Sequence, residues 1–203
     1  MKFFNVDNPV WRFVGNLADF FVLSVLWAVC CLPVVTIGAS TTALYYVTMK
    51  MARNREGELI PSFFASFRQN LRQGIALWVG YLAVGLLIGL NIFITIQNGS
   101  LVSGAMFITC VVLALLWALT ETMQFPLLAR CANTVPALFK MGVAITVRNI
   151  PAVAAALITK LAFAAVGVFL FWPLLLLAPG LSAYCNSFLF NRILSKYGFD
   201  LPE

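Results

Sequence analysis

The chain has 203 residues, of which 62% are hydrophobic and 10% are charged, and its net charge is +6. Soluble domains are typically about 45–50% apolar and about 25% charged, so these values exclude an ordinary soluble fold and indicate an integral membrane protein. Histidine is absent, which removes the commonest metal ligand and the commonest general base at neutral pH. The positive charge fits lysine and arginine at the cytoplasmic ends of membrane helices better than it fits nucleic-acid binding.

The first predicted membrane helix covers residues 9–32. At 1.5 Å per residue it would be about 36 Å long, which is enough to cross a hydrocarbon core of about 30 Å. Asp19 lies inside this helix. A carboxylate at that depth is costly in lipid, so we expect Asp19 to face protein.

A turn with the sequence LPVVTIGAS follows, and we identify Pro33, Thr36 and Gly38 as its candidate structural residues. Proline lacks an N–H and fixes its own φ, which favours a helix break just before Pro33. Gly38 would permit a sharp reversal of the chain. The next predicted helix, about 38–54, is only just long enough to span. It either crosses, which gives six membrane helices, or it is re-entrant, which gives five.

Residues 61–73, PSFFASFRQNLRQ, form a basic, amphipathic segment. Phe63 and Phe67 fall on one helical face, whereas Arg68 and Arg72 fall elsewhere. This pattern is typical of a short helix that lies at the membrane surface. The same segment could instead dock a protein partner, and the two roles are compatible.

Two long apolar stretches, 74–97 and 103–130, predict the third and fourth membrane helices. The connection between them, residues 98–102, is short and uncharged. The fourth stretch contains Glu121, an ionisable group well inside the predicted span.

A second amphipathic segment covers residues 136–148 and carries Lys140 and Arg148. Together with the two arginines of the first segment, these cations predict a cytoplasmic surface that contacts anionic lipid or docks a partner. The fifth predicted span, 151–172, contains Lys160. Prolines within residues 173–181 predict a break in helix geometry, after which a short sixth helix covers about 181–196.

The basic residues predict the orientation of the chain. With six helices, the connections at 33–37, 98–102 and 173–180 fall on one side and contain no lysine or arginine. All basic residues except Lys160 fall on the other side. Because cytoplasmic loops are enriched in lysine and arginine, both termini should be cytoplasmic. The predicted fold is therefore an all-α membrane helix bundle, with residues 1–203 as a single integral membrane domain.

Three ionisable residues, Asp19, Glu121 and Lys160, form a candidate intramembrane polar site. Glu121 lies nine residues before Arg130, and Lys160 lies eleven after Asn149. At 1.5 Å per residue both lie roughly 13–17 Å from the cytoplasmic helix ends, so we predict that they pair. Asp19 is the competing partner of the lysine. The pair would either orient helices or form a substrate or proton site.

The five cysteines lie in apolar surroundings, and no two form a C-x-x-C motif. We therefore expect small buried hydrophobic side chains rather than a disulfide framework.

Three stretches occur in the order found in one bacterial family: LPVVTIGASTTALYYV from residue 32, SFFASFRQNLRQ from residue 62, and FPLLARC at 125–131. They resemble the YesL-like family of bacterial integral membrane proteins. This resemblance covers essentially the whole chain and implies the bacterial cytoplasmic membrane and a link with carbohydrate uptake. It implies no catalytic residue.

Motifs of nucleotide-binding, zinc-protease and serine-hydrolase sites are missing: G-x-x-x-x-G-K-[ST], H-E-x-x-H and G-x-S-x-G. We therefore expect no enzyme, no cofactor and no metal. The expected function is that of a non-catalytic accessory component associated with carbohydrate uptake, with the bilayer and a carbohydrate transporter complex as partners and no nucleic acid. The alternative is a small transporter or permease that acts as a homo-oligomer.

Overall fold

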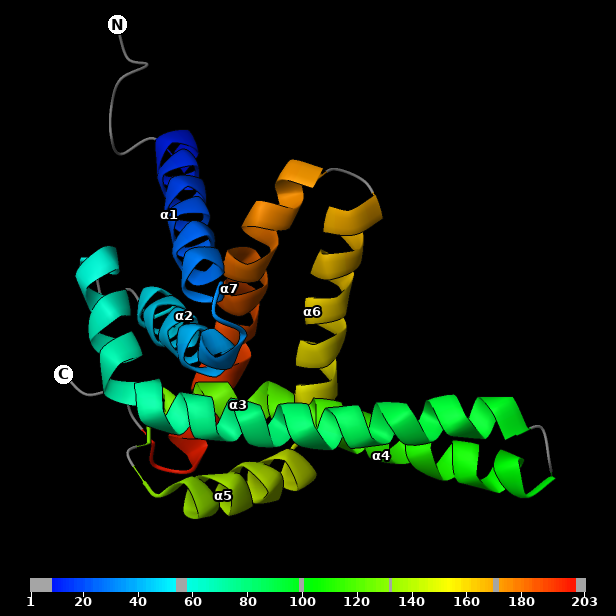
Figure 1. Cartoon of the computed structure of the whole chain (residues 1–203). Helices are drawn as coiled ribbons and strands as arrows, with labels where there is room; N and C mark the ends of the chain where they lie inside the picture. Colours follow the sequence, from blue (N-terminus) through cyan, green and yellow to red (C-terminus); the bar gives the residue numbers. More distant parts are fainter. Residues whose placement is uncertain (1–8, 54–57, 99–100, 132, 170–171, 200–203) are drawn as a thin grey trace, which may run out of the picture.

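The computed structural model describes residues 9–53, 58–98, 101–131, 133–169 and 172–199, which form helices and short connections with no strand among them (Figure 1). The all-α prediction is confirmed. The elements are α1 (Pro9–Cys30), a short 3-10 turn η1 (Val34–Thr36), α2 (Ile37–Met51), α3 (Leu59–Asn98), α4 (Leu101–Leu128), α5 (Val135–Arg148), α6 (Ile150–Phe169) and α7 (Trp172–Lys196).

Three of the described helical stretches are long and apolar enough, by length and composition, to cross a membrane: Leu59–Gln97, Gly104–Leu128 and Ile150–Val168. A shorter apolar stretch, Leu17–Cys30, lies in α1. Large apolar side chains on these helices face outwards; Ile108 and Ile158, for example, are each 66% exposed. Such surfaces are unfavourable in water and suit contact with lipid.

Helix α2 lies at the centre of the molecule, in contact with α1, α3, α4 and α7 (Figure 1). Ten of its 15 residues are buried. At 1.5 Å per residue α2 is about 22 Å long, which is shorter than a hydrocarbon core of about 30 Å. Helix α2 alone is therefore too short to cross the core in a straight line. Protein rather than lipid surrounds this helix.

The predicted surface helix at 61–73 does not exist as a separate element. It forms the beginning of α3, a single helix of 40 residues. The amphipathic segment adjoins the apolar span directly, with no proline at the junction, and Gly74 continues the helix. Figure 1 shows α3 bending near its start. In this first part of the helix the Asn70 amide donates to Ser66 O, one turn earlier, at 3.0 Å. Side-chain bonds of this kind compete with the helical ladder and favour bending.

The predicted break at 173–181 is also wrong, because α7 is continuous from Trp172 to Lys196. Pro173 lies in its first turn, where a missing N–H costs little. Pro179 lies inside the helix, and a neighbouring helix satisfies the backbone beside it: the Ser24 hydroxyl of α1 accepts a hydrogen bond from the Gly180 N–H at 2.9 Å. Serine side chains from neighbouring helices allow proline inside membrane helices in this way.

Candidate functional site

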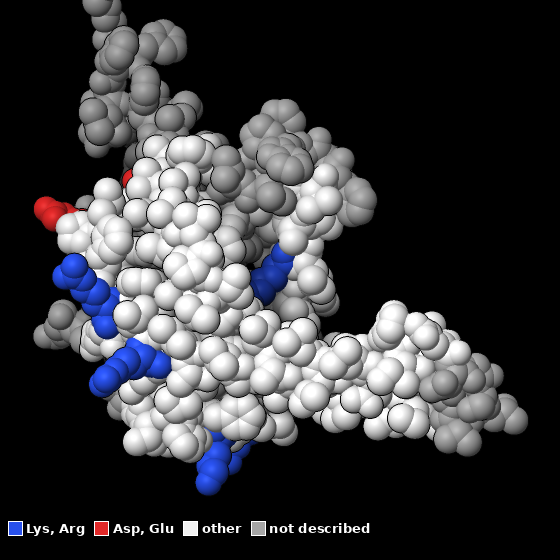
Figure 2. All heavy atoms as spheres, viewed as in Figure 1, with Lys and Arg blue, Asp and Glu red and all other residues white. Residues whose placement is uncertain are grey.

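The polar centre of the molecule lies where two helix pairs diverge. Helices α3 and α4 pack together and extend as an arm, whereas α6 and α7 pack together and run in another direction (Figure 1). The surface is hollowed between the arm and the α6–α7 pair (Figure 2). Helices α4 and α6 contact each other at the base of this region.

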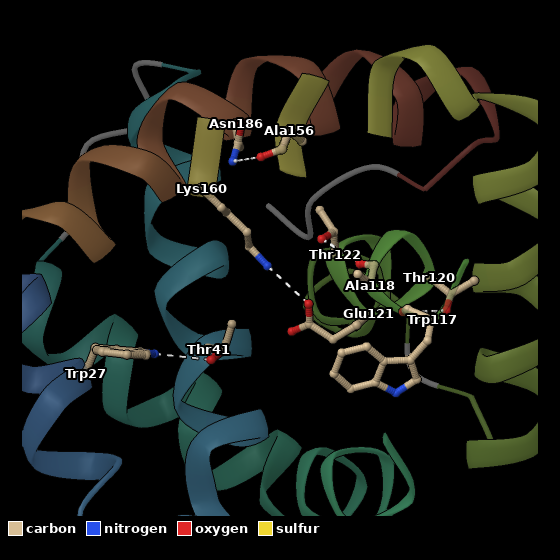
Figure 3. Close-up of polar contacts among 10 residues, drawn as sticks. All are labelled: Trp27, Thr41, Trp117, Ala118, Thr120, Glu121, Thr122, Ala156, Lys160 and Asn186. Atoms are coloured by element: carbon tan, nitrogen blue, oxygen red, sulfur yellow. Dashed lines mark hydrogen bonds and ion pairs between the residues drawn. The ribbon is translucent and has the colours of Figure 1, made fainter. Parts of the chain in front are cut away.

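Glu121 and Lys160 meet at the contact between α4 and α6 (Figure 3). Lys160 Nζ lies 3.5 Å from Glu121 Oε2, and the two side chains are 24% and 20% exposed, respectively. The predicted pairing is confirmed. Asp19 lies on α1 and forms no ion pair with another described residue, so the structure places only two of the three candidate polar residues together. A part in substrate or proton binding stays a prediction.

Polar groups of α2 and α7 surround the ion pair. Tyr45 of α2 is only 2% exposed and lies near both charges. One turn before Lys160, the carbonyl of Ala156 accepts a hydrogen bond from Asn186 Nδ2 at 3.1 Å, which joins α6 to α7 (Figure 3). The ion pair is therefore part of a polar helix junction.

A line of polar side chains on α7 extends this junction towards α2. Ser187 Oγ donates its hydrogen either to Thr48 Oγ1, at 2.8 Å, or to a backbone carbonyl of its own helix. Asn191 Nδ2 donates to the carbonyl of Met49 at 3.1 Å. Hydrogen bonds between helices are a main source of association in lipid, where apolar contact gives no hydrophobic gain. Sequence reasoning missed these residues. The available signal was the spacing of polar residues, with Asn186 four positions after Ser182, on an otherwise apolar helix.

A second polar contact that the sequence did not predict lies between α4 and α5. Gln124 is fully buried, and a Cβ at Gly142 would lie 1.9 Å from its Oε1. Both polar atoms of the Gln124 amide and the hydroxyl of Thr146 are buried without a hydrogen-bond partner among the described residues. Buried groups of this kind are normally bonded to ordered water. Gln124 lies one turn after Glu121, so polar groups continue from the ion pair towards α5.

The candidate turn residues have two different roles. The Thr36 hydroxyl closes the turn because it shares its hydrogen between the carbonyls of Cys30, at 2.6 Å, and Pro33, at 2.7 Å. Gly38 does not reverse the chain as predicted; it lies inside α2. A Cβ at Gly38 would lie 2.3 Å from the carbonyl oxygen of Gly74, so this glycine permits a close crossing of α2 and α3.

The four candidate cytoplasmic cations are exposed, and none forms an ion pair with a described residue. Arg68 and Arg72 lie in the first half of α3, and Lys140 and Arg148 lie on α5. In Figure 2 basic side chains gather at the end of the molecule away from the arm, while the described surface of the arm is uncharged. This separation agrees with the charge asymmetry in the sequence.

The five cysteines are free thiols, and the expectation that they are buried is wrong. Cys185 is exposed, and the other four, Cys30, Cys31, Cys110 and Cys131, are partly exposed. Partial burial raises the pKa of the Cys131 thiol, which lies beyond the end of α4. The described residues contain no group of three or more His, Cys, Asp or Glu side chains that could hold a metal ion.

Comparison with known proteins gives one family match. Residues 20–92 match the family model described as "Protein of unknown function, DUF624". The matched segment runs from within α1 to near the end of α3, and it includes the turn residues and two of the candidate cations. No curated protein matches the chain, and no solved structure matches it.

Proposed function

We propose that this chain, which is similar to DUF624 over residues 20–92, is a non-catalytic accessory component of a carbohydrate-uptake system in the bacterial cytoplasmic membrane. The YesL-like proteins, which the chain resembles, belong to that family. Their link with carbohydrate uptake supports the sugar connection. The observation that carries the proposal is the exposed basic end formed by α3 and α5, whose four cations pair with no described carboxylate.

The basic end offers a surface for a cytoplasmic protein with acidic groups. Complementary charges steer association and select partners, and they do so most strongly when the charges are exposed and uncompensated. Arg68 and Arg72 are one turn apart on α3, and no described carboxylate pairs with either of them. The apolar arm, by contrast, offers lipid contact and no charge for such a partner.

Reversing both charges should weaken the interaction. Arg68→Glu combined with Arg72→Glu should reduce recovery of co-purified partner proteins from native membranes and slow growth on the relevant saccharide. The protein itself should still insert, because both side chains are exposed. The matched control is Arg68→Lys with Arg72→Lys, which keeps the charge and should keep both recovery and growth. Normal growth of the charge-reversed strain would contradict the accessory role.

The proposal also requires a cytoplasmic basic end. In a cysteine-free variant, Ser100→Cys should react with an impermeant thiol reagent added to intact cells, and Asn54→Cys should not, because the positive-inside rule places residue 54 on the cytoplasmic side. Both positions lie outside the described residues. Disruption of the cells should make Asn54→Cys reactive. The reverse labelling pattern in intact cells would overturn the orientation.

A second candidate function is a small transporter or permease that acts as a homo-oligomer. The supporting observation is the ion pair of Lys160 and Glu121, which remains partly exposed at the contact between α4 and α6. Ionisable residues inside membranes are often part of substrate or ion pathways. Purified protein in liposomes separates the two proposals: movement of a sugar or an ion down its gradient would support transport and reject the accessory role.

A further inference from the structure

Helices α3, α4 and α5 form a groove of about 590 Å³. Its walls include Gly80 and Tyr81 of α3, Trp117 of α4 and Phe139 of α5. The rings pack together around Tyr81, whose centroid lies 6.3 Å from that of Trp117 and 6.0 Å from that of Phe139. Trp117 Nε1 donates to the backbone carbonyl of Tyr81 at 3.0 Å, so the indole offers the groove an apolar face.

The shape and chemistry of the groove fit a long apolar chain. Small-molecule sites typically have volumes of about 300–1,000 Å³ and mostly apolar walls, and this groove is within that range. It lies along two of the helices that are long and apolar enough to cross a membrane. Acyl chains of lipids are the apolar molecules that such a surface meets.

Two cations lie close in the chain to residues of the groove walls. Arg72 lies one turn before Ala76, a wall residue of α3, and Lys140 directly follows Phe139 on α5. Both cations are exposed, and neither pairs with a described carboxylate. Gln73 Nε2 donates to the carbonyl of Asn133 at 2.9 Å, which holds this part of α3 against the connection that leads into α5. Basic residues beside clefts between membrane helices recognise anionic headgroups.

We propose that the groove binds an acyl chain of an anionic phospholipid, with the lipid phosphate at Arg72 and Lys140. The lipid comes from the leaflet that faces the basic end. This site shares Arg72 and Lys140 with the docking surface proposed above, but it also uses the apolar walls of the groove, which the docking role does not need. The bound lipid contacts α3, α4 and α5 together. The lipid composition of the membrane therefore affects how strongly α5 is attached to the other two helices.

Gly80 provides a selective way to block the groove. A Cβ added there meets no atom within 4 Å, and Gly80 lines the groove, so we expect a larger side chain at this position to extend into the groove. Gly104 of α4 is the matched control, because it is also exposed with no atom within 4 Å of an added Cβ and it is not part of the groove.

The test is native mass spectrometry of the full chain in detergent, titrated with phosphatidylglycerol or with phosphatidylcholine of the same acyl chains. The unmodified protein should bind one phosphatidylglycerol at least about tenfold more tightly than phosphatidylcholine, since two cations contribute to the difference. Gly80→Leu should weaken phosphatidylglycerol binding by about tenfold or more, because it removes several buried methylene contacts. Gly104→Leu should bind as the unmodified protein does.

A second variant tests the headgroup contact independently. Arg72→Gln with Lys140→Gln should remove the preference for phosphatidylglycerol and leave the weaker binding of phosphatidylcholine, which Gly80→Leu should still reduce. Equal binding of the two lipids by the unmodified protein would overturn the proposal, as would unchanged binding by Gly80→Leu. A dimer that Gly80→Leu dissociates would also overturn it, since a second copy of the chain would then occupy the groove.

Discussion

Lys160→Met should destabilise the protein by about 3–5 kcal/mol, because it leaves Glu121 charged and unpaired within the helix bundle. Glu121→Gln should have a similar cost for the converse reason. The double variant should recover much of the loss, since neither charge then remains without a partner. The measurement is the free energy of unfolding in detergent for the four members of this double-mutant cycle.

Asp19→Asn is the control for this cycle. Asp19 forms no ion pair with a described residue, so its neutralisation should change the free energy of unfolding far less than neutralisation of either partner in the pair. Additive losses in the double variant would show that Lys160 and Glu121 do not stabilise one another.

Gly74→Ala should be the most damaging single-methyl change on α3. Its Cβ would lie 2.7 Å from both the Cα and the N of Ala39, and backbone atoms cannot move aside as a flexible side chain can. Overpacking typically costs about 1–3 kcal/mol, and we expect the upper end of that range here. Gly38→Ala should have a comparable cost, because it would place a methyl group against the carbonyl oxygen of Gly74 from the other side of the crossing.

The control is Gly89→Ala on the same helix, where an added Cβ meets nothing within 4 Å. Alanine is about 1 kcal/mol more favourable than glycine in a helix interior, so this variant should be neutral or slightly more stable. Thermal unfolding of the three variants in one detergent compares them directly. Equal midpoints for the Gly74 and Gly89 variants would mean that α2 and α3 do not cross closely.

The ion pair could be predicted from sequence because helix geometry fixes depth. Each residue adds about 1.5 Å along the axis, so counting from the helix ends placed Glu121 and Lys160 at one level before any contact was known. The same counting could not choose between Glu121 and Asp19, since depth says nothing about which helices are neighbours. The packing of α6 against α4 decides that question.

Other features depended on partners that are distant in the chain. Proline within residues 173–181 predicts a helix break when only the local sequence is considered, but Ser24 of α1 supplies a bond beside Pro179 from 156 residues away. The local sequence around Gly38 likewise predicts a turn. Its role in the close crossing of α2 and α3 depends on Gly74, which is distant in the chain. The groove needs α3, α4 and α5 together, and none of their three sequences indicates it alone.

The central position of α2 has a consequence for how the protein is made. Helix α2 leaves the ribosome before α7, yet α7 covers part of its polar surface: Thr48 contacts Ser187, and the Met49 carbonyl contacts Asn191. A nascent chain whose helices α1 to α6 have entered the bilayer still lacks these partners. Helix α2 is also too short to form a stable span alone. The polar contacts of α2 therefore cannot be complete until α7 has been inserted, and a chain truncated before α7 would leave Thr48 and the Met49 carbonyl without these partners.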